Sequence, residues 1–321
     1  MSRGNSLKVI SGNAHREFAE KICNELGIEL ANVESFKFSD GETGVRFGES
    51  VRGSDIFIIQ PTCSPTNENI MNLLIMADAV KRASAHYVNA VIPYFGYCRQ
   101  DRKAKPREPI TAKLVANLIA HSGIDRVITT DLHAGQIQGF FDIPVDHLTA
   151  MNLFASYFKD FLADELADGR VVVVSPDVGG VARARRFAVK LNVEIAIVDK
   201  RRSHDVANVS EVMDIVGNIK GRTAILVDDI IDTAGTICHA ADGLIERGCE
   251  RVFACATHAV LSGSAMENIK KSAIERLIFS DTIPLTPEKK TDKVIQLSIA
   301  PAFAEAIRRV HKEESISQMF E

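Results

Sequence analysis

Short apolar runs recur along the whole chain, and stretches with helical character separate many of them. Several runs are continuous Val/Ile segments without polar alternation, which is typical of parallel strands buried on both faces. The expected strands are residues 8–11, 55–60, 86–93, 126–130, 171–175, 194–198, 223–227, 251–257 and 276–280. The expected helices include residues 69–83, 112–121, 181–190 and 236–247. This alternation predicts an α/β protein with mainly parallel sheets flanked by helices.

A local exception is expected in the second half of the chain. A polar segment that contains glycine separates the apolar residues 212–216 from the strand expected at 223–227. Such a short connection favours a hairpin. We therefore expect these two segments to form one antiparallel pair within the parallel pattern.

A faint internal repeat divides the chain into two similar domains. DIFIIQPTCSPTNENIMNLLIMADAVKRASAHYVNAVIPY and RTAILVDDIIDTAGTICHAADGLIERGCERVFACATH both read strand, polar loop, helix, strand. The expected domains are residues 1–150 and 151–304, with the tail 305–321 packing back on the first domain. The alternative is that any two β-α-β units look alike.

Composition excludes several classes of protein. The 321 residues are 46% apolar and carry a formal net charge of −4, so no general attraction to nucleic acid or membranes is expected. No apolar run approaches the roughly 18–20 residues of a membrane span, and the first ten residues lack a signal-peptide core. The six cysteines show no CxxC spacing, which indicates reduced thiols in a cytoplasmic protein.

The stretch ILVDDIIDTAGT (225–236) places two carboxylates, Asp228 and Asp229, directly after an apolar strand. Adjacent carboxylates repel each other and are costly to desolvate. In open parallel sheets, however, ligands bind beyond the carboxyl ends of the strands. There the pair can bind ribose hydroxyls or a hard cation such as Mg²⁺. The alternative is a solvated acidic pair.

The five residues after the acidic strand suit a phosphate group. Small residues let backbone N–H groups approach an anion closely, and the start of the helix expected at 236–247 supplies partial positive charge. Threonine hydroxyls add donors. The alternative is that Asp232 merely caps the helix. The residues concerned are Asp232, Thr233, Ala234, Gly235 and Thr236.

Further motifs, in order along the chain, resemble those of the ribose-phosphate diphosphokinases, also called phosphoribosyl-diphosphate synthetases. The motifs are FSDGE (38–42), YCRQDRKAKPREPITAK (97–113), DLHAGQIQGFFDIPVD (131–146), SPDVGG (175–180), DKRR (199–202) and the acidic stretch above. The resemblance implies two phosphoribosyltransferase-type domains. It also implies Mg²⁺-dependent transfer of a diphosphoryl group from ATP to the anomeric hydroxyl of ribose 5-phosphate. No GxxxxGK[ST] phosphate loop occurs in the chain, so the nucleotide must be held differently.

The resemblance assigns the nucleotide to the N-terminal domain. It implies metal contacts for His133 and Asp177, although histidine is an atypical ligand for Mg²⁺. From the residues alone, His133 reads as a hydrogen-bonded structural histidine, and Phe38 as a core side chain before a solvated turn. The expected ATP-binding residues are Phe38, Asp40, Gly41, Glu42, Arg99, Gln100, Asp101 and His133.

The C-terminal domain is expected to hold ribose 5-phosphate through Arg202, Asp228, Asp229 and residues 232–236. Lys200 and Arg202 are the expected catalytic cations, because phosphoryl transfer depends on positioning and electrostatics. Residues 99–109 read as a solvated basic loop or as one that closes over the triphosphate. Gly179 and Gly180 admit a pyrophosphate or simply make a turn.

Two wider properties are implied only by the resemblance. The chain is expected to form homo-oligomers, with a hexamer as the expected state. Ser50, Arg52, Ser315 and Ser317 are expected to build an allosteric anion site between subunits, because a guanidinium and several hydroxyls suit phosphate oxygens. The alternative is a surface arginine and ordinary terminal serines.

Two rival functions share parts of this pattern. A transferase that consumes phosphoribosyl diphosphate shares the acidic stretch but does not need FSDGE, RQD or DLHAGQIQGFF. A catalytically silent regulatory subunit should lack Lys200, Arg202 or the basic loop, and this chain retains all three. The sequence therefore favours the enzyme that makes phosphoribosyl diphosphate.

Overall fold

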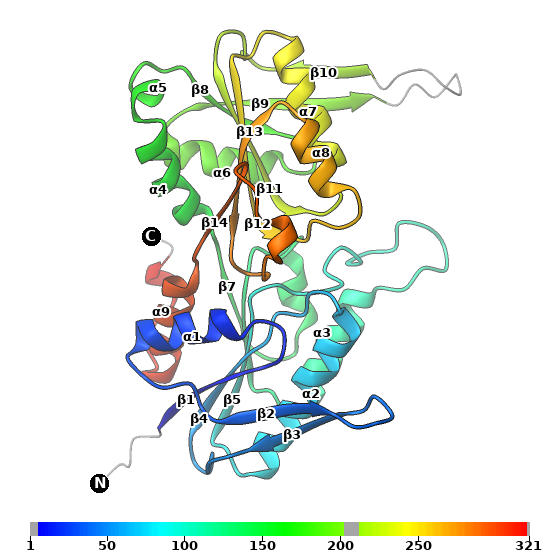
Figure 1. Ribbon diagram of the computed structural model, residues 1–321, viewed down its shortest axis with the longest axis vertical. Coiled ribbons are helices and arrows are strands. Elements are labelled where there is room, and N and C mark those ends of the chain that lie inside the picture. Colours follow the sequence, from blue (N-terminus) through cyan, green and yellow to red (C-terminus); the bar gives the residue numbers. More distant parts are fainter. Residues whose placement is uncertain (1–5, 202–211, 320–321) are drawn as a thin grey trace. The chain divides into compact units, whose positions relative to one another are not determined.

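The computed structural model describes residues 6–201 and 212–319 of the chain (Figure 1). The chain divides into two compact units, each with its own sheet and helices. The first unit comprises Met1–Thr149, Thr282–Pro284 and Ser298–Glu321, and the second comprises Ala150–Asp281 and Leu285–Leu297. No helix in the described ranges is long and apolar enough to cross a membrane.

The first unit is built on a five-stranded parallel sheet in the order β1-β4-β5-β6-β7. Its strands are β1 (Leu7–Ser11), β4 (Asp55–Ile59), β5 (Tyr87–Ile92), β6 (Arg126–Thr130) and β7 (Val145–Leu148). A separate antiparallel hairpin pairs β2 (Val33–Lys37) with β3 (Thr43–Phe47). The helices are α1 (Arg16–Leu26), α2 (Thr66–Arg82), α3 (Thr111–His121) and α9 (Ala300–His311), with short 3₁₀ turns η1 (Gly135–Phe140) and η3 (Ser317–Met319).

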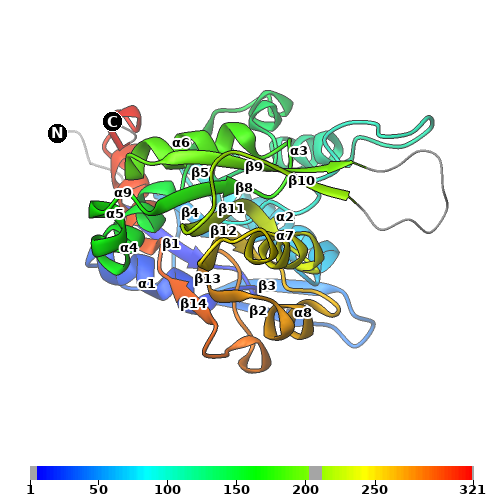
Figure 2. The same cartoon turned by 90° about the horizontal axis from the view of Figure 1, so that it is seen from above.

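The second unit has a seven-stranded sheet in the order β10-β9-β8-β11-β12-β13-β14. Its strands are β8 (Val171–Ser175), β9 (Glu194–Arg201), β10 (Val212–Val216), β11 (Thr223–Ile231), β12 (Arg251–Ala259), β13 (Ile274–Ser280) and β14 (Val294–Leu297). Its helices are α4 (Met151–Phe161), α5 (Ala163–Ala167), α6 (Val181–Leu191), α7 (Gly235–Glu246) and α8 (Ala265–Lys271), with the 3₁₀ turn η2 (Pro287–Lys289). Figure 2 shows α6 on one side of this sheet and α7 on the other.

The chain order of these strands creates a switch point in the second unit. From β8 the chain crosses through α6 to β9 on one side, and from β11 it crosses through α7 to β12 on the other side. Both β-α-β crossovers are expected to be right-handed. Two such crossovers that move in opposite directions across a sheet place their helices on opposite faces of it. Ligands of such sheets bind where the direction reverses, outside the carboxyl ends of the two diverging strands. That place is the carboxyl end of β8 and β11.

The expected parallel α/β architecture is confirmed, and every strand expected from an apolar run is present. The expected antiparallel pair is wrong in its partner, because β10 pairs with β9 and not with β11. The physical reason is that β11 is hydrogen-bonded on both sides, to β8 and to β12, so it has no free edge, whereas the outer edge of β9 is open to β10.

The C-terminal helix belongs as a whole to the first unit. Whereas the sequence suggested that the tail packs back from residue 305, the first unit resumes at Ser298. Helix α9 lies against α1, and the rings of Phe18 and Phe303 meet edge to face with centroids 5.5 Å apart. Both rings are fully buried, so the helix cannot be divided at residue 305 without exposing its apolar face.

Candidate active site

The acidic pair lies on β11 at the switch point. The pairing of β11 with β8 ends at Leu226, whereas its pairing with β12 continues to Ile231. Asp228 and Asp229 therefore lie within the strand, in the part that projects beyond β8, and the expected strand end at residue 227 is wrong by four residues. The pair is still outside the carboxyl end of β8, as the interpretation as a ligand site requires.

Arg183 forms ion pairs with both carboxylates. Arg183, in the first turn of α6, places Nη1 2.8 Å from Asp228 Oδ1 and Nη2 2.8 Å from Asp229 Oδ1. Asp229 is 3% exposed. Burial and the neighbouring Asp229 charge raise the pKa of Asp228 to about 8, although Arg183 opposes this shift. The Arg183 guanidinium thus pairs with two carboxylates that are held largely out of water.

Arg183 was not among the residues expected from sequence. It is the third residue of the helix that starts after SPDVGG, and helices commonly carry arginine on their solvent face. One sequence signal could have identified Arg183. It lies in the first turn of the helix that follows β8, and β8 pairs with the strand that carries Asp228 and Asp229. A side chain in that place points toward the carboxyl end of the sheet.

The loop after β11 is held from outside the helix. Ser262 donates a hydrogen bond to Asp232, and Asn268 Nδ2 donates to the carbonyl oxygen of Thr233 at 2.9 Å. Ala234 adopts φ 61° and directly precedes α7. The N-cap residue of α7 is Ala234, whose side chain makes no cap hydrogen bond, so Asp232 does not occupy the N-cap position.

The SPDVGG turn after β8 is closed by its own polar groups. Ser175 Oγ donates to the carbonyl oxygen of Asp177 at 2.7 Å, and the Gly180 N–H donates to Asp177 Oδ1 at 2.8 Å. A Cβ at Gly180 would lie 2.8 Å from Ser175 Oγ, so any larger residue would have to displace this hydroxyl.

Of the two expected catalytic cations, the backbone of Lys200 belongs to β9, whereas Arg202 lies outside the described residues.

The FSDGE motif forms the tip of the β2–β3 hairpin in the first unit. The N–H of Phe38 donates to the carbonyl oxygen of Glu42 at 2.8 Å, and Gly41 has φ 92°, which closes the turn. Asp40 Oδ1 accepts the Glu42 N–H at 3.1 Å. The Phe38 side chain is 53% exposed, so the alternative of a core phenylalanine is wrong. An exposed ring beside two carboxylates is available to a base.

The YCRQD and DLHAGQ motifs meet in the first unit. Gln136 Nε2 donates to Asp101 Oδ2 at 3.3 Å, and Gln100 Oε1 accepts from the hydroxyl of Thr111 at 2.5 Å. The basic loop is ordered by Glu108, whose Oε2 accepts the N–H groups of Ala104 and Lys105 at 3.0 and 2.8 Å. The expected nucleotide residues 99–101 are thereby held at the carboxyl end of β5 and next to that of β6.

His133 is exposed just after β6, and a second histidine, His147, contacts the turn that follows this strand. His147 Nε2 accepts the Leu132 N–H at 2.9 Å, which fixes the turn that follows the strand. His133 belongs to the first unit and Asp177 to the second, so neither unit by itself contains both expected metal ligands. Within the described parts of the chain, no group of three or more His, Cys, Asp or Glu side chains has the arrangement of a metal site.

The residues of the expected anion site lie on two segments of the first unit. Ser50 and Arg52 are exposed before β4, where the Arg52 N–H donates to Ser50 Oγ at 3.4 Å. Ser315 and Ser317 follow α9. Arg309 Nη1 fixes that segment by donating to the carbonyl oxygen of Ser315 at 2.7 Å and to Gln318 at 3.0 Å.

Comparison with known proteins identifies the family. Residues 7–123 match the model of the N-terminal domain of ribose phosphate pyrophosphokinase, and residues 203–321 match that of the phosphoribosyl synthetase-associated domain. A ribose-phosphate pyrophosphokinase of Caldanaerobacter subterraneus subsp. tengcongensis is 58% identical over 316 residues, with 98% of each chain covered. The chain belongs to the ribose-phosphate pyrophosphokinase family. The family expected from the motifs is therefore confirmed.

Other ribose-phosphate pyrophosphokinases are similar over the same length. Ribose-phosphate pyrophosphokinase 1 of Streptococcus pyogenes serotype M1 is 55% identical over 315 residues, again with 98% of each chain covered. The crystal structure of phosphoribosylpyrophosphate synthetase from Mycobacterium smegmatis superposes with a TM-score of 0.90 at 42% identity. This match covers 96% of the present chain and all of the other. The α/β fold of the family is thus shared by the whole chain.

Proposed function

We propose that the protein transfers the diphosphoryl group of ATP to ribose 5-phosphate, giving phosphoribosyl diphosphate and AMP for nucleotide biosynthesis. The observation that carries this proposal is the carboxylate pair at the switch point of the second unit, with the small-residue loop and the start of α7 directly after it. Carboxylates bind sugar hydroxyls, and the loop with the helix start binds the 5-phosphate. The full-length similarity to ribose-phosphate pyrophosphokinases supports this assignment.

The reaction needs no covalent intermediate with the protein. The anomeric oxygen of ribose 5-phosphate forms a bond to the β-phosphorus of ATP, the bond from that phosphorus to the oxygen bridging to the α-phosphorus breaks, and AMP leaves. The hydroxyl proton is released. Lys200 and Arg202 stabilise the charge that spreads over the transferring group. The role of the remaining residues is to bind and orient the two substrates.

The two substrates are assigned to different units. The nucleotide is bound by the first unit, with Phe38 against the base, and ribose 5-phosphate is bound by the second. The proposed nucleotide residues are Phe38, Asp40, Gly41, Glu42, Arg99, Gln100, Asp101 and His133. The proposed ribose-phosphate residues are Arg202, Asp228, Asp229, Asp232, Thr233, Ala234, Gly235 and Thr236.

Mg²⁺ is the proposed cofactor, and the chemistry of the donor set fits it. Hard cations prefer carboxylate oxygens, and the raised pKa of Asp228 marks a pair that one guanidinium leaves undercompensated. When bound, the ion neutralises charge on the polyphosphate and favours the ionised form of nearby carboxylates. Asp228 and Asp229 are candidates to face the ion with the sugar hydroxyls, while His133 and Asp177 are the proposed contacts of the metal–nucleotide complex.

The activity is tested by incubating the protein with ATP, Mg²⁺ and ribose 5-phosphate. Formation of AMP and phosphoribosyl diphosphate in equal amounts is expected. A transferase that consumes phosphoribosyl diphosphate would form no AMP from this mixture, and a catalytically silent subunit would leave both substrates unchanged. Either result contradicts the proposal.

Asp228→Ala is expected to weaken ribose 5-phosphate binding by about tenfold or more while ATP binding largely survives, because the sugar loses a carboxylate acceptor in the second unit. Calorimetry with each ligand separately measures both affinities. Glu246→Ala, at the end of α7 in the same unit, is the matched control and should bind both ligands as the wild type does. Loss of ATP affinity with unchanged sugar affinity would reverse the assignment of the two substrates.

We also propose that the protein is a cytoplasmic homo-oligomer, with a hexamer as the expected state, and that Ser50, Arg52, Ser315 and Ser317 bind phosphate or ADP between subunits. Arg52→Ala should then blunt phosphate activation and ADP inhibition while unstimulated turnover stays nearly intact, since Arg52 supplies the only guanidinium of that set. Rates at varied phosphate and ADP measure this. A wild-type enzyme that is indifferent to phosphate, and that ADP inhibits only in competition with ATP, would rule out the site.

A further inference from the structure

The proposed nucleotide residues 99–101 follow β5 through the sharp turn PYFGY (93–97). Tyr97 in this turn has φ 65°, in the left-handed region that bulky residues rarely adopt. Such a conformation persists only where the surrounding contacts hold it. The direction in which residues 99–101 leave the turn therefore depends on the contacts that hold Tyr97.

One fully buried threonine closes the turn. Thr62 follows β4, and its N–H donates to the carbonyl oxygen of Tyr94 at 2.9 Å. The Thr62 hydroxyl also donates to that oxygen, at 3.1 Å, and it accepts the Gly96 N–H at 2.6 Å. A single side chain thus joins the two sides of the turn, and both of its partners belong to buried residues.

The turn packs directly on the backbone after β4. A Cβ at Gly96 would lie 2.4 Å from the carbonyl oxygen of Thr62. On the side of α2, the Tyr97 hydroxyl donates to Asn67 Oδ1 at 2.5 Å. Beyond the turn, the Gln100 N–H donates to the carbonyl oxygen of Tyr97 at 2.9 Å. A continuous series of contacts therefore leads from Thr62 through the turn to a proposed nucleotide residue.

The segment that carries Thr62 is itself fixed to α2. The buried Asn69 side chain donates to the carbonyl oxygen of Cys63 at 2.8 Å, and the Asn69 carbonyl oxygen accepts Gln60 Nε2 at 3.1 Å. Residues on both sides of Thr62 are thus held by one residue of the helix. The hydroxyl of Thr62 has a fixed place from which it orients the turn.

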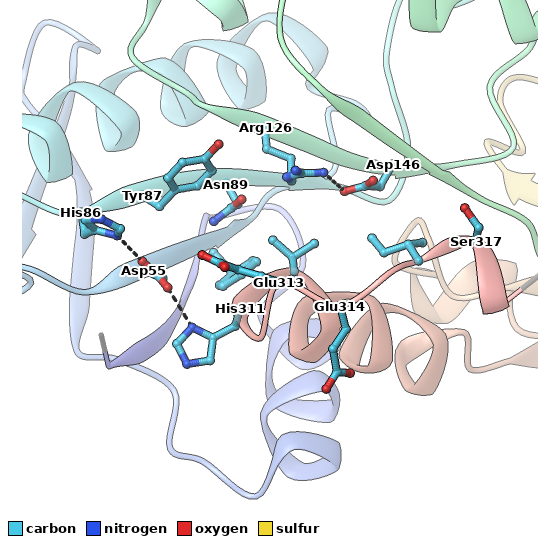
Figure 3. Close-up of a pocket in the computed structure, with 13 residues that line it drawn as sticks. Asp55, His86, Tyr87, Asn89, Arg126, Asp146, His311, Glu313, Glu314 and Ser317 are labelled. Atoms are coloured by element: carbon cyan, nitrogen blue, oxygen red, sulfur yellow. Dashed lines mark hydrogen bonds and ion pairs between the residues drawn. The ribbon is translucent and has the colours of Figure 1, made fainter. Parts of the chain in front are cut away.

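At its amino end, β4 is fixed independently of Thr62. Figure 3 shows Asp55, the first residue of β4, at a cavity of about 770 Å³ with His86 and His311 as its partners. The Nδ1 atoms of the two histidines each lie 2.8 Å from a different oxygen of the Asp55 carboxylate. Loss of the Thr62 hydroxyl should therefore displace the turn and leave the strand in place.

We propose that Thr62 is a positioning residue whose hydroxyl sets the affinity for ATP through the turn, without contacting the nucleotide. This role rests on the proposed function, in which the first unit binds ATP. Thr62→Val keeps the shape of the side chain but leaves the buried Gly96 N–H without an acceptor. An unpaired buried N–H is costly, so the turn shifts, Tyr97 leaves its left-handed conformation and residues 99–101 are displaced.

The test is a calorimetric titration of ATP with Mg²⁺ into the full-length protein and its variants. Thr62→Val should weaken ATP binding about tenfold or more. Thr62→Ser, which keeps the hydroxyl, should stay within a few-fold of the wild type. Thr223→Val is the matched control and should bind ATP as the wild type does. It makes the same exchange at a buried threonine of the second unit, whose hydroxyl has no hydrogen-bond partner among the described residues.

Steady-state kinetics separate this role from a general loss of stability. In Thr62→Val the KM for ATP should rise about tenfold or more, whereas turnover at saturating ATP and the KM for ribose 5-phosphate should change by less than a few-fold. A variant that is merely less stable would lose active protein, which lowers the rate at saturation and leaves the KM for ATP unchanged. That pattern would overturn the proposal.

Two calorimetric results would also overturn it. They are equal ATP affinity of Thr62→Val and the wild type, and an equal loss of affinity in Thr62→Val and Thr62→Ser. If the wild type binds ATP but forms no AMP with ribose 5-phosphate, the proposed reaction fails, and the calorimetric comparison still decides the role of Thr62. A wild type that does not bind ATP would overturn both.

Discussion

Lys200→Ala and Arg202→Ala are each expected to reduce turnover by about 10²–10³-fold, the usual cost of removing one contact made to the transition state. Substrate affinities should change much less, because the charge that these cations meet develops mainly as the diphosphoryl group is transferred. The prediction rests on the DKRR motif. The backbone of Lys200 lies near the carboxyl end of β9, next to β8, and Arg202 lies outside the described residues.

Initial rates of AMP formation at saturating and at varied ATP and ribose 5-phosphate separate turnover from affinity. Arg201→Ala is the matched control, because it removes a cation from the same motif to which no catalytic role is assigned, and it should stay within a few-fold of the wild type. Near-normal turnover in both Lys200→Ala and Arg202→Ala would remove these residues from the mechanism.

Arg183→Ala is expected to lower the free energy of unfolding by about 3 kcal/mol near pH 8, because it leaves the buried carboxylates of Asp228 and Asp229 without their shared cation. The loss has an upper limit, because Asp228 can take up a proton instead. Burial and Asp229 already hold its pKa well above the ordinary value, at about 8 with Arg183 in place. Removing Arg183 raises it further.

The sign of the pH dependence follows from that shift. A carboxyl group whose pKa is raised by folding binds a proton more tightly in the folded state, so its contribution is favourable below the unfolded pKa of about 3.9 and is lost as pH rises through the folded value. Because the wild type and the variant both hold this proton well below pH 8, the stability of Arg183→Ala should fall further behind that of the wild type as pH rises from 6 through about 8 to 9.

Urea denaturation across this pH range, without substrates or Mg²⁺, measures the difference. Arg186→Ala, an exposed arginine of the same helix, is the control and should differ from the wild type by less than about 0.5 kcal/mol. Adding Asp228→Asn to Arg183→Ala should restore most of the lost stability, since one of the two carboxylates is then gone. Equal stability of Arg183→Ala and the wild type at pH 8 would show that the guanidinium does not compensate the pair.

Sequence patterns predicted the central strands because those strands carry their own signal. Val171–Ser175 is buried at every position, and an apolar run of that length has few alternatives. The hairpin β2–β3 was missed for the opposite reason. VESFK and TGVRF are mostly half-buried or exposed and mix charged with apolar residues, so neither segment shows an apolar run. Their pairing is visible only when the turn at Gly41 is known.

Site residues that are adjacent in the chain could be predicted from the sequence. Site residues that are joined by ion pairs to residues far away in the chain could not. Asp228 and Asp229 are neighbours, so their repulsion is evident from sequence. Arg183 lies 45 residues from Asp228 and is one of several arginines in its helix, so nothing local distinguishes it. His311 contacts Asp55 across 256 residues for the same reason. Contacts of this kind depend on the strand order, which local patterns do not encode.

The place of α9 in the first unit has a consequence for synthesis of the protein. The ribosome releases the residues that form α1 and the five parallel strands long before it reaches Ala300–His311. At roughly 5–20 residues per second, the growing chain waits on the order of ten seconds or more for this helix. During that interval, Phe18 lacks the ring of Phe303 that covers it in the finished molecule. The second unit, apart from its edge strand β14, comes from one continuous stretch and so can reach its native form first, although it is made later.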